Sequence, residues 1–258
     1  MLVDSHCHLE YEGLVEDQAG ALDRAREAGV ERFLNISTKQ AEWAQVVGTA
    51  RATPDVYASV GIHPHNADDH VDLTREELRA ATDEPKVIGI GETGLDYYYD
   101  HSDRETQQHL FRLHIDVARE VQLPVIIHTR DAEDDTLAIL QDEMGKGAFP
   151  ALIHCFTASA DFGRAVLDLG LSVSISGIVT FKSARDLQEF AREIPRDRLL
   201  VETDSPFLAP VPHRGKPCEP GFVRDTARFL ADLRGESLEE LADYTTRNFH
   251  SLFAKASA

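Results

Sequence analysis

A histidine pair near the start of the sequence offers the first chemistry. The first eight residues read as a short strand that ends in His6-Cys7-His8. Because successive side chains of a strand point to opposite faces, His6 and His8 share one face and Cys7 points to the other. Two imidazoles placed in this way can share a metal ion, although a two-histidine strand taken alone is more often a packed edge.

Further histidines and carboxylates fall where later apolar segments end. These strand-end residues are His63, Glu92, His128, His154 and Asp204. Chance would explain one or two such placements, but not the whole set. Since the carboxyl ends of barrel strands meet at one rim, where active sites lie, the sequence predicts that these side chains form one site with the histidine pair.

The mixture of ligand types indicates a centre for divalent metal ions. Imidazole and carboxylate both bind such ions, and two ions a few ångströms apart need a bridging group. Glu92 comes from a middle strand and is the natural bridge. We expect one ion between Glu92, Asp204 and the histidine pair, and a second ion, with open positions, at His128 and His154. Asp204 can also accept a proton from the attacking water.

Alternating apolar and amphipathic segments predict the elements that hold these residues. Strands are expected at 1–8, 33–37, 56–62, 87–92, 125–128, 151–154, 171–175 and 199–204. Helices are expected at 14–29, 40–52, 73–81, 104–121, 132–144, 158–169, 184–194, 222–233 and 238–253. The pattern predicts an α/β fold, a TIM-type (β/α)8 barrel that forms a single domain over residues 1–258. An open doubly wound sheet is the alternative, weakened because no GxGxxG or Walker segment follows a strand.

The charge balance limits how a substrate can be held. With 26 Lys and Arg against 45 Asp and Glu, the formal net charge is −19. The simplest explanation is a solvated acidic surface, and adaptation to a salty cytoplasm is the alternative. Such a charge argues against a wide basic footprint for nucleic acid, so metal ions and a few arginines must hold any polyanionic substrate locally.

Cysteine usage and hydropathy indicate the compartment. The three cysteines are an odd number, lie far apart and form no CxxC motif, which favours reduced thiols. Cys7 and Cys155 alternate with candidate ligands, and we expect both to pack away from the site. No apolar run is long enough to span a bilayer, and the chain begins directly with a strand, so we expect a cytoplasmic protein with no membrane contact and no obligate protein partner.

Several more residues are candidates for supporting roles. His63 suits a contact with a phosphate or a scissile oxygen, and the alternative is a hydrogen bond within its loop. Arg130 can bind a phosphate through two N–H donors, and the alternative is a salt bridge to a carboxylate. His213 and Arg214 begin a compact basic patch at 213–216 that either binds a nucleic acid backbone or is merely solvated. Glu202 is expected deeper in the barrel, orienting a ligand rather than binding the metal. The tyrosine run at 97–99 is expected to pack in its loop, with base stacking as the alternative.

Taken together, these motifs resemble the signatures of the TatD family, the metal-dependent deoxyribonucleases of the amidohydrolase superfamily. The resemblance runs from residue 2 to about the C-terminal helix. The segments that carry it are Asp4-Ser5-His6-Cys7-His8, Gly61-Ile62-His63-Pro64, Gly91-Glu92-Thr93-Gly94-Leu95-Asp96, Ile127-His128-Thr129-Arg130, His154-Cys155-Phe156-Thr157 and Glu202-Thr203-Asp204-Ser205-Pro206.

The resemblance implies a TIM-type barrel, a centre of one or two metal ions, and hydrolysis of DNA phosphodiesters, often from the 3′ end. Carried over motif by motif, it implies these metal ligands: His6, His8, Glu92, His128, His154 and Asp204. Many members of the superfamily bridge their ions with a modified lysine; here Glu92 stands on the fourth strand, which agrees with the TatD branch. The family favours Mg²⁺, and the ligand types also suit Mn²⁺ or Zn²⁺.

We therefore expect a metal-dependent hydrolase that acts as a 3′–5′ exonuclease on DNA, with Asp204 as ligand and general base. TatD-like members that remove D-amino acids from tRNA use the same ligands, so a D-aminoacyl-tRNA deacylase is the alternative, and RNA or tRNA are alternative substrates. A metal-binding partner protein without catalysis is the alternative from another class, disfavoured because an inactive relative would be free to lose Asp204.

Overall fold

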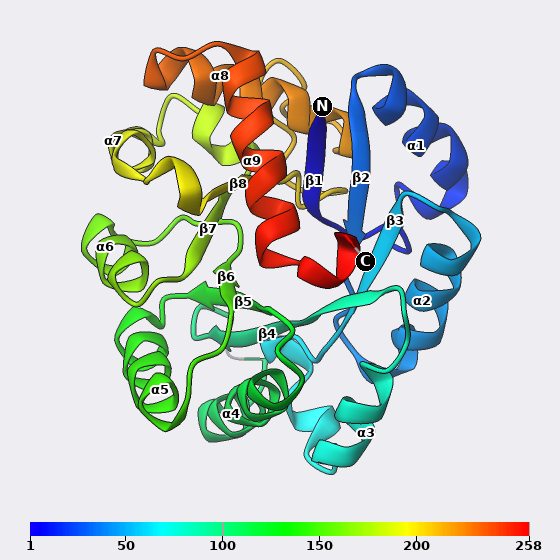
Figure 1. Ribbon diagram of the computed structural model, residues 1–258, viewed down its shortest axis with the longest axis vertical. Helices are drawn as coiled ribbons and strands as arrows, with labels where there is room; N and C mark the ends of the chain where they lie inside the picture. Colours follow the sequence, from blue (N-terminus) through cyan, green and yellow to red (C-terminus); the bar gives the residue numbers. More distant parts are fainter. Residues whose placement is uncertain (100, 258) are drawn as a thin grey trace.

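Eight parallel strands follow one another around a barrel in the order of the sequence (Figure 1). The computed structural model describes residues 1–99 and 101–257. Its strands are β1 (Leu2–Cys7), β2 (Val30–Asn35), β3 (Val56–Val60), β4 (Val87–Asp96), β5 (Val125–Arg130), β6 (Ala151–Ile153), β7 (Ser172–Ile175) and β8 (Leu199–Val201). The predicted single-domain TIM-type barrel is confirmed, and the alternative open sheet is wrong.

Most of the helices surround the strands on the outside, and the last one lies across an end of the barrel (Figure 1). The helices are α1 (Gln18–Glu27), α2 (Trp43–Ala52), α3 (Arg75–Ala81), α4 (Arg104–Val121), α5 (Glu133–Lys146), α6 (Ala160–Asp168), α7 (Arg185–Glu193), α8 (Val223–Arg234) and α9 (Leu238–Leu252). Helix α4 has the predicted bounds, because the Asp103 side chain accepts hydrogen bonds from the first turn and its apolar stripe is continuous. None of the described helices is both long and apolar enough to cross a membrane.

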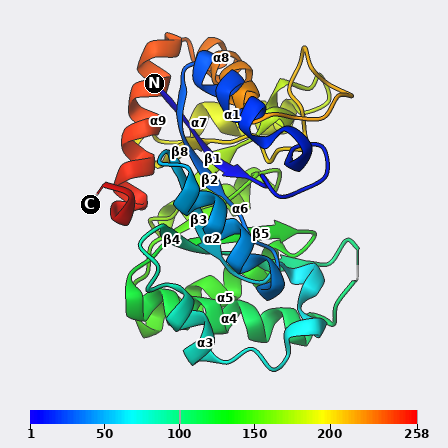
Figure 2. The same ribbon diagram turned by 90° about the vertical axis from the view of Figure 1, so that its right-hand side faces the viewer.

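The amino end of the barrel is filled by an apolar cluster beneath α9. Phe249 and Phe253 pack there against buried residues that come from several strands, Val3, Leu34, Ile88, Ile126, Leu152 and Leu200. Figure 2 shows α9 on the side of the barrel opposite the long loops that follow the strands. Since one end is plugged, a ligand can enter only from the carboxyl ends of the strands.

Strand β4 is longer than predicted, since it continues beyond Glu92 to Asp96. Glycine commonly begins a turn, and the strand was predicted to end at Glu92. In the structure, Gly94 has φ +135° and pairs with His128 on β5, and a Cβ at this position would overlap the carbonyl oxygen of His128. Only glycine permits this approach, which places Asp96 on the same strand face as Glu92 and beside β5.

The seam between β8 and β1 is held by residues that follow β8. The predicted strand at 199–204 ends early, at Val201, because Asp4 takes over the hydrogen bonding: its carboxylate accepts from the Thr203 amide at 2.9 Å and from the Thr203 hydroxyl at 2.6 Å. The Asp204 amide donates to the carbonyl of His6 at 2.9 Å, and the His8 amide donates to that of Ser205 at 2.8 Å. This pairing sets Asp204 beside the histidine pair of β1.

Candidate metal centre

The carboxyl ends of the strands surround a cavity of about 790 Å³. Its floor holds most of the strand-end residues named from the sequence, and its wall includes several aromatic side chains. Among the described residues, the lining includes His8, His63, Glu92, His128, His154, Asp204, Tyr11, Tyr99 and Phe207. His6 is fully buried beneath this floor. The structure thus brings all six predicted ligands to one place.

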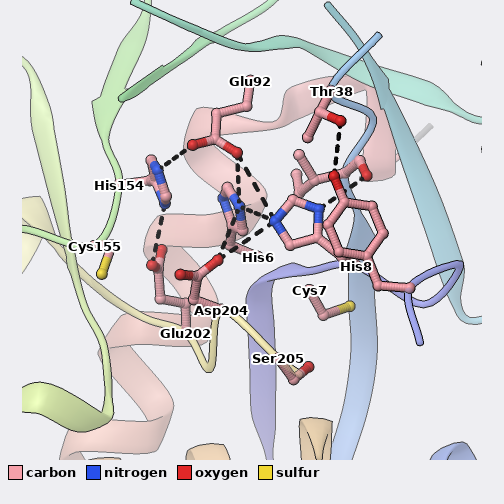
Figure 3. Close-up of polar contacts among 12 residues, drawn as sticks. His6, Cys7, His8, Thr38, Glu92, His154, Cys155, Glu202, Asp204 and Ser205 are labelled. Carbon is pink, nitrogen blue, oxygen red and sulfur yellow. Dashed lines mark hydrogen bonds and ion pairs between the residues drawn. The ribbon is translucent and has the colours of Figure 1, made fainter. Parts of the chain in front are cut away.

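Four ligand atoms form a compact group on one side of Glu92 (Figure 3). His6 Nε2 lies 3.2 Å from His8 Nε2, 3.4 Å from Glu92 Oε2 and 3.5 Å from Asp204 Oδ1. His8 Nε2 lies 3.8 Å from Glu92 Oε2 and 3.4 Å from Asp204 Oδ1. A tetrahedral ion with ligand bonds of about 2.0–2.1 Å would space its ligand atoms by about 3.3–3.4 Å. The separations within this group therefore suit a divalent ion.

The other oxygen of Glu92 faces a second group of histidines. Glu92 Oε1 lies 2.7 Å from His154 Nε2, 3.0 Å from His128 Nδ1 and 3.5 Å from His63 Nε2. His63, Glu92 and His128 form one of the triplets whose ligand atoms are close enough to hold an ion. Each oxygen of Glu92 therefore faces a different histidine group.

The polar atoms of the site fit metal ions better than they fit one another. His154 Nε2 is buried beside Glu92 Oε1 and yet makes no hydrogen bond. The Nε2 atoms of His6 and His8 also face each other at 3.2 Å, where at most one proton can lie between two lone pairs. A cation on each side of Glu92 would satisfy all of these atoms.

Neighbouring groups fix the orientation of the histidine rings. Asp96 Oδ2 lies 3.0 Å from His128 Nε2, and Glu202 Oε1 lies 3.3 Å from His154 Nδ1. The His8 ring has its Nδ1 3.3 Å from the carbonyl oxygen of Ile36. Each contact occupies the nitrogen that faces away from Glu92, which leaves the other nitrogen for a metal. Glu202 is thus where an orienting residue is expected to lie.

Burial and mutual attraction shift the protonation of the site in opposite directions. Burial disfavours the charged form of Glu92, but attraction to His154 and His63 holds the pKa of this carboxyl well below its usual range. Burial likewise opposes the charge on Asp204, and the hydrogen bond from His8 nevertheless keeps the pKa of Asp204 below normal. Burial lowers the pKa of His6 and of His63. Burial also opposes protonation of His8, His128 and His154, but attraction to the neighbouring carboxylates raises the pKa of these three rings. The site therefore offers ionised carboxylates, and a metal ion would have to displace the proton from a histidine that binds it.

Backbone geometry helps to aim the side chains of Glu92 and Asp204. Gly91 has φ +144°, and a Cβ there would lie 2.6 Å from the carbonyl oxygen of Ile126, so only glycine allows β4 this close to β5 just before Glu92. Asp204 itself adopts the left-handed region, with φ +56°. Such conformations in residues other than glycine often mark functional sites.

The substrate-contact candidates from the sequence lie at different distances from the centre. Arg130 lines the cavity, where its guanidinium stacks over Tyr98 at 4.1 Å and over Tyr99 at 4.7 Å. Within residues 1–99 and 101–257 it makes no ion pair, so the alternative role in a salt bridge to a carboxylate is not found there. The basic patch lies outside the cavity lining: His213 stacks on Phe222 and its Nε2 lies 3.1 Å from Asp225 Oδ2.

Sequence reasoning missed several residues of the site. Asp96 is fully buried between His128 and His65, whose Nε2 lies 2.9 Å from Asp96 Oδ2. The alternation Glu92, Gly94, Asp96 along one strand face was the signal that could have found it. Cys155 lines the cavity instead of packing away from it, because its φ of +43° turns the chain directly after His154.

Comparison with known proteins agrees with this architecture. The family model described as TatD related DNase matches residues 3–254. The uncharacterised metal-dependent hydrolase YcfH of Escherichia coli K12 is 46% identical over 255 residues, which cover 98% of this chain and 95% of that protein. The 3′–5′ ssDNA/RNA exonuclease TatD of Pantoea vagans is 37% identical over 246 residues, 93% of this chain and 94% of that protein.

Solved structures show the same barrel. The crystal structure of YjjV, a TatD homologue from Escherichia coli K12, superposes with a TM-score of 0.91 at 28% identity and covers 98% of each chain. The family match spans nearly the whole sequence, and the chain has clustered histidines and carboxylates that could hold a metal ion. This chain therefore belongs to the TatD family of metal-dependent hydrolases, built on an amidohydrolase-like barrel.

Proposed function

We propose that this protein hydrolyses the phosphodiester bonds of DNA, as a 3′–5′ exonuclease whose Glu92 bridges two divalent ions. The observation that carries the proposal is the division of Glu92 between two ligand groups, with Oε2 near His6 and Oε1 near His154. A pair of ions held in this way suits an in-line displacement at phosphorus. The Pantoea vagans relative, described as an exonuclease on ssDNA and RNA, supports this choice of bond and of direction.

The chain's own residues have distinct roles in this reaction. When bound, the divalent ions would supply charge stabilisation at the phosphoryl group and lower the pKa of a nearby water. Asp204 takes the proton of the attacking water; its side chain is 16% exposed, faces the cavity and has a lowered pKa that keeps it ionised. Arg130 and His63, both on the cavity wall, hold the phosphate in line with the water.

The ligand set accommodates more than one metal. We propose Mg²⁺ as the working ion, from the family resemblance, with Mn²⁺ and Zn²⁺ as alternatives that the four histidines also suit. For the compartment, the cytoplasm stays our proposal, because Cys7, Cys155 and Cys218 are all unpaired, as thiols are in a reducing environment.

The test uses purified protein loaded in turn with Mg²⁺, Mn²⁺ or Zn²⁺. Single-stranded DNA labelled at the 5′ end should shorten stepwise to a ladder, whereas label at the 3′ end should be released at once. Glu92→Gln and Asp204→Asn should abolish cleavage, and the control Asp243→Asn, an exposed carboxylate on α9, should retain it.

Two other substrates decide between the proposal and its alternatives. The same preparation is assayed on single-stranded RNA and on D-aminoacyl-tRNA. Release of D-amino acids with no cleavage of DNA would replace the exonuclease by a deacylase that uses the same centre. No hydrolysis of any of these substrates with any of the three metals would overturn the proposal.

A further inference from the structure

The basic side chains without a partner are gathered on one face of the molecule. Most of the 26 Lys and Arg side chains pair with a carboxylate, as Arg24 does, or donate to a backbone carbonyl, as Arg224 does. Within residues 1–99 and 101–257, the side chains with neither kind of partner are Arg130, Lys182, Arg185, Arg214 and Lys216. All belong to segments at the carboxyl ends of the strands, where the cavity opens.

Four of these cations come from two loops that pack together. Lys182 and Arg185 lie between β7 and the first turn of α7, and Arg214 and Lys216 lie in the segment after β8; we refer to these four residues as the basic rim. The guanidinium of Arg214 stacks over the Phe181 ring at 4.3 Å.

The backbones of the two loops are also in contact. The Val211 amide donates to Thr180 Oγ1 at 2.9 Å. A Cβ at Gly177 would overlap the carbonyl oxygen of Leu208, so glycine is needed for this close approach. The side chains of the basic rim therefore project from one joined surface, on the side of the barrel where the long loops lie in Figure 2.

The same two loops reach into the cavity. Ile178 from the first loop and Phe207 and Leu208 from the second line its wall. Phe207 is 50% exposed, and its ring centre lies 6.4 Å from that of His8 and 6.1 Å from that of Tyr11. A polymeric ligand that extends from the metal centre past Phe207 would thus reach the basic rim next.

The charge distribution indicates which kind of polymer this ligand would be. On a molecule with a net charge of −19, unpaired cations beside one opening attract a polyanion to that opening, while the rest of the surface repels it. An exposed aromatic ring offers its face to a base only where the base is not paired, as in a single strand. A duplex would need a wider basic footprint than these loops provide.

We propose that the basic rim binds the backbone of a single-stranded polynucleotide that lies 5′ of the scissile phosphate, and that Phe207 stacks on a base between the metal centre and the rim. The proposal rests on the proposed function for the identity of the reacting bond. The rim itself can be tested by binding alone, which separates the two.

The binding test uses fluorescence anisotropy with a labelled single strand of about 20 nucleotides, in an Asp204→Asn background that does not consume the strand. Lys182→Glu with Arg214→Glu should raise Kd at least about tenfold and make the slope of log K against log salt shallower by about 1.4, the value for two lost phosphate contacts. The matched control carries Arg198→Glu and Arg247→Glu, the same change of charge at exposed sites away from the cavity, and should keep the Kd and slope of its background.

A second variant tests the stacking step. Phe207→Ala should weaken binding by about 5- to 150-fold, the loss of one stacked base, without changing the salt slope. Phe207→Leu keeps an apolar side chain but has no aromatic ring, so its affinity for the strand should fall nearly as far. If it binds as the parent does, Phe207 supplies only apolar contact and the stacking assignment is overturned.

The kinetic test compares substrate lengths. The ratio of kcat/KM for the long strand to that for a dinucleotide should fall at least about tenfold in the rim variant and stay constant in its control, because only the long strand reaches the rim. An unchanged ratio and Kd in the rim variant would overturn the proposal, as would a duplex that binds equally well with the same dependence on the rim. If the wild-type protein cuts neither DNA substrate, the proposed function fails, and the binding test still decides the rim.

Discussion

Asp96 Oδ2 lies 3.0 Å from His128 Nε2, on the side of the ring opposite Glu92, whose Oε1 lies 3.0 Å from Nδ1. Burial of His128 opposes its protonation, but the hydrogen bonds to Asp96 and Glu92 raise the pKa of this ring above its ordinary value. With a metal at Nδ1, the proton would sit at Nε2 and bond to Asp96. Asp96 thus fixes both the tautomer and the direction of a ligand.

Replacing Asp96 should loosen the second metal position without unfolding the barrel. We expect Asp96→Asn to weaken binding of the second ion by about 10- to 100-fold, because the amide no longer anchors the His128 N–H as a charged acceptor. Titration calorimetry with Mn²⁺ measures this directly. The control Asp135→Asn, at an exposed carboxylate that bonds to the Tyr97 hydroxyl, should bind both ions normally. Equal affinities in Asp96→Asn and wild type would show that Asp96 does not orient the ligand.

Arg130 should contribute to substrate binding through the paired N–H donors of its guanidinium group. We expect Arg130→Ala to lower kcat/KM on single-stranded DNA by about 10- to 100-fold, the value of a hydrogen bond to a charged group. Arg130→Lys keeps the charge but loses the paired donors and the stacking on Tyr98 and Tyr99. Its kcat/KM should therefore lie between that of Arg130→Ala and that of the wild type. Full activity in Arg130→Ala, with unchanged metal content, would remove Arg130 from the site.

Gly94 should be intolerant of any side chain. We expect Gly94→Ala to reduce the free energy of unfolding by about 3 kcal/mol or more, because its Cβ would overlap the His128 carbonyl and its φ is +135°. Gly145→Ala is the control: this helical glycine has open space around it, and alanine there should stabilise α5 by up to about 1 kcal/mol. Urea unfolding of the three proteins gives the comparison, and a Gly94→Ala variant as stable as wild type would contradict the close pairing of β4 with β5.

A buried histidine outside the metal centre should make stability depend on pH. Burial lowers the pKa of His114 to about 4, and its ring accepts a hydrogen bond from the Ile62 amide at 3.0 Å. The folded chain keeps this ring neutral, whereas the unfolded chain protonates it below its ordinary value of 6.5. Its contribution to stability is therefore complete above about pH 6.5 and is lost as the pH falls toward about 4.

The measurement compares urea unfolding of metal-free wild type and His114→Gln at two pH values. Between about pH 7.5 and about pH 5.5, wild type should lose about 1.4 kcal/mol more stability than the variant, which has no ring to titrate. Parallel losses in the two proteins would mean that His114 is already protonated, or equally accessible, in the folded state.

The barrel could be predicted from the sequence because its signals are local and repeated. Alternating apolar and amphipathic segments predicted the eight strands and their order, and the apolar stripe of α4 predicted its bounds. The carboxyl ends of parallel barrel strands lie at one rim, because the strands share one direction. The sequence therefore also predicted that His6, His8, Glu92 and the other ligand candidates lie together.

Features that depend on contacts between distant segments could not be predicted in this way. Gly94 reads as a turn in isolation, and only its pairing with His128 shows that the strand continues to Asp96. The φ of Cys155, which turns it into the cavity, has no local signal in the sequence. The isolation of Arg214 from every described carboxylate is likewise a tertiary property, visible only when its loop is seen against Phe181.

The central claim is that Glu92 bridges two metal ions, and anomalous diffraction from crystals soaked in Mn²⁺ tests it most directly. The account predicts two peaks about 3.5–4 Å apart, one on each side of the Glu92 carboxylate, and the loss of at least one peak in Glu92→Gln. Peaks that lie elsewhere, or two peaks that persist unchanged in Glu92→Gln, would contradict it.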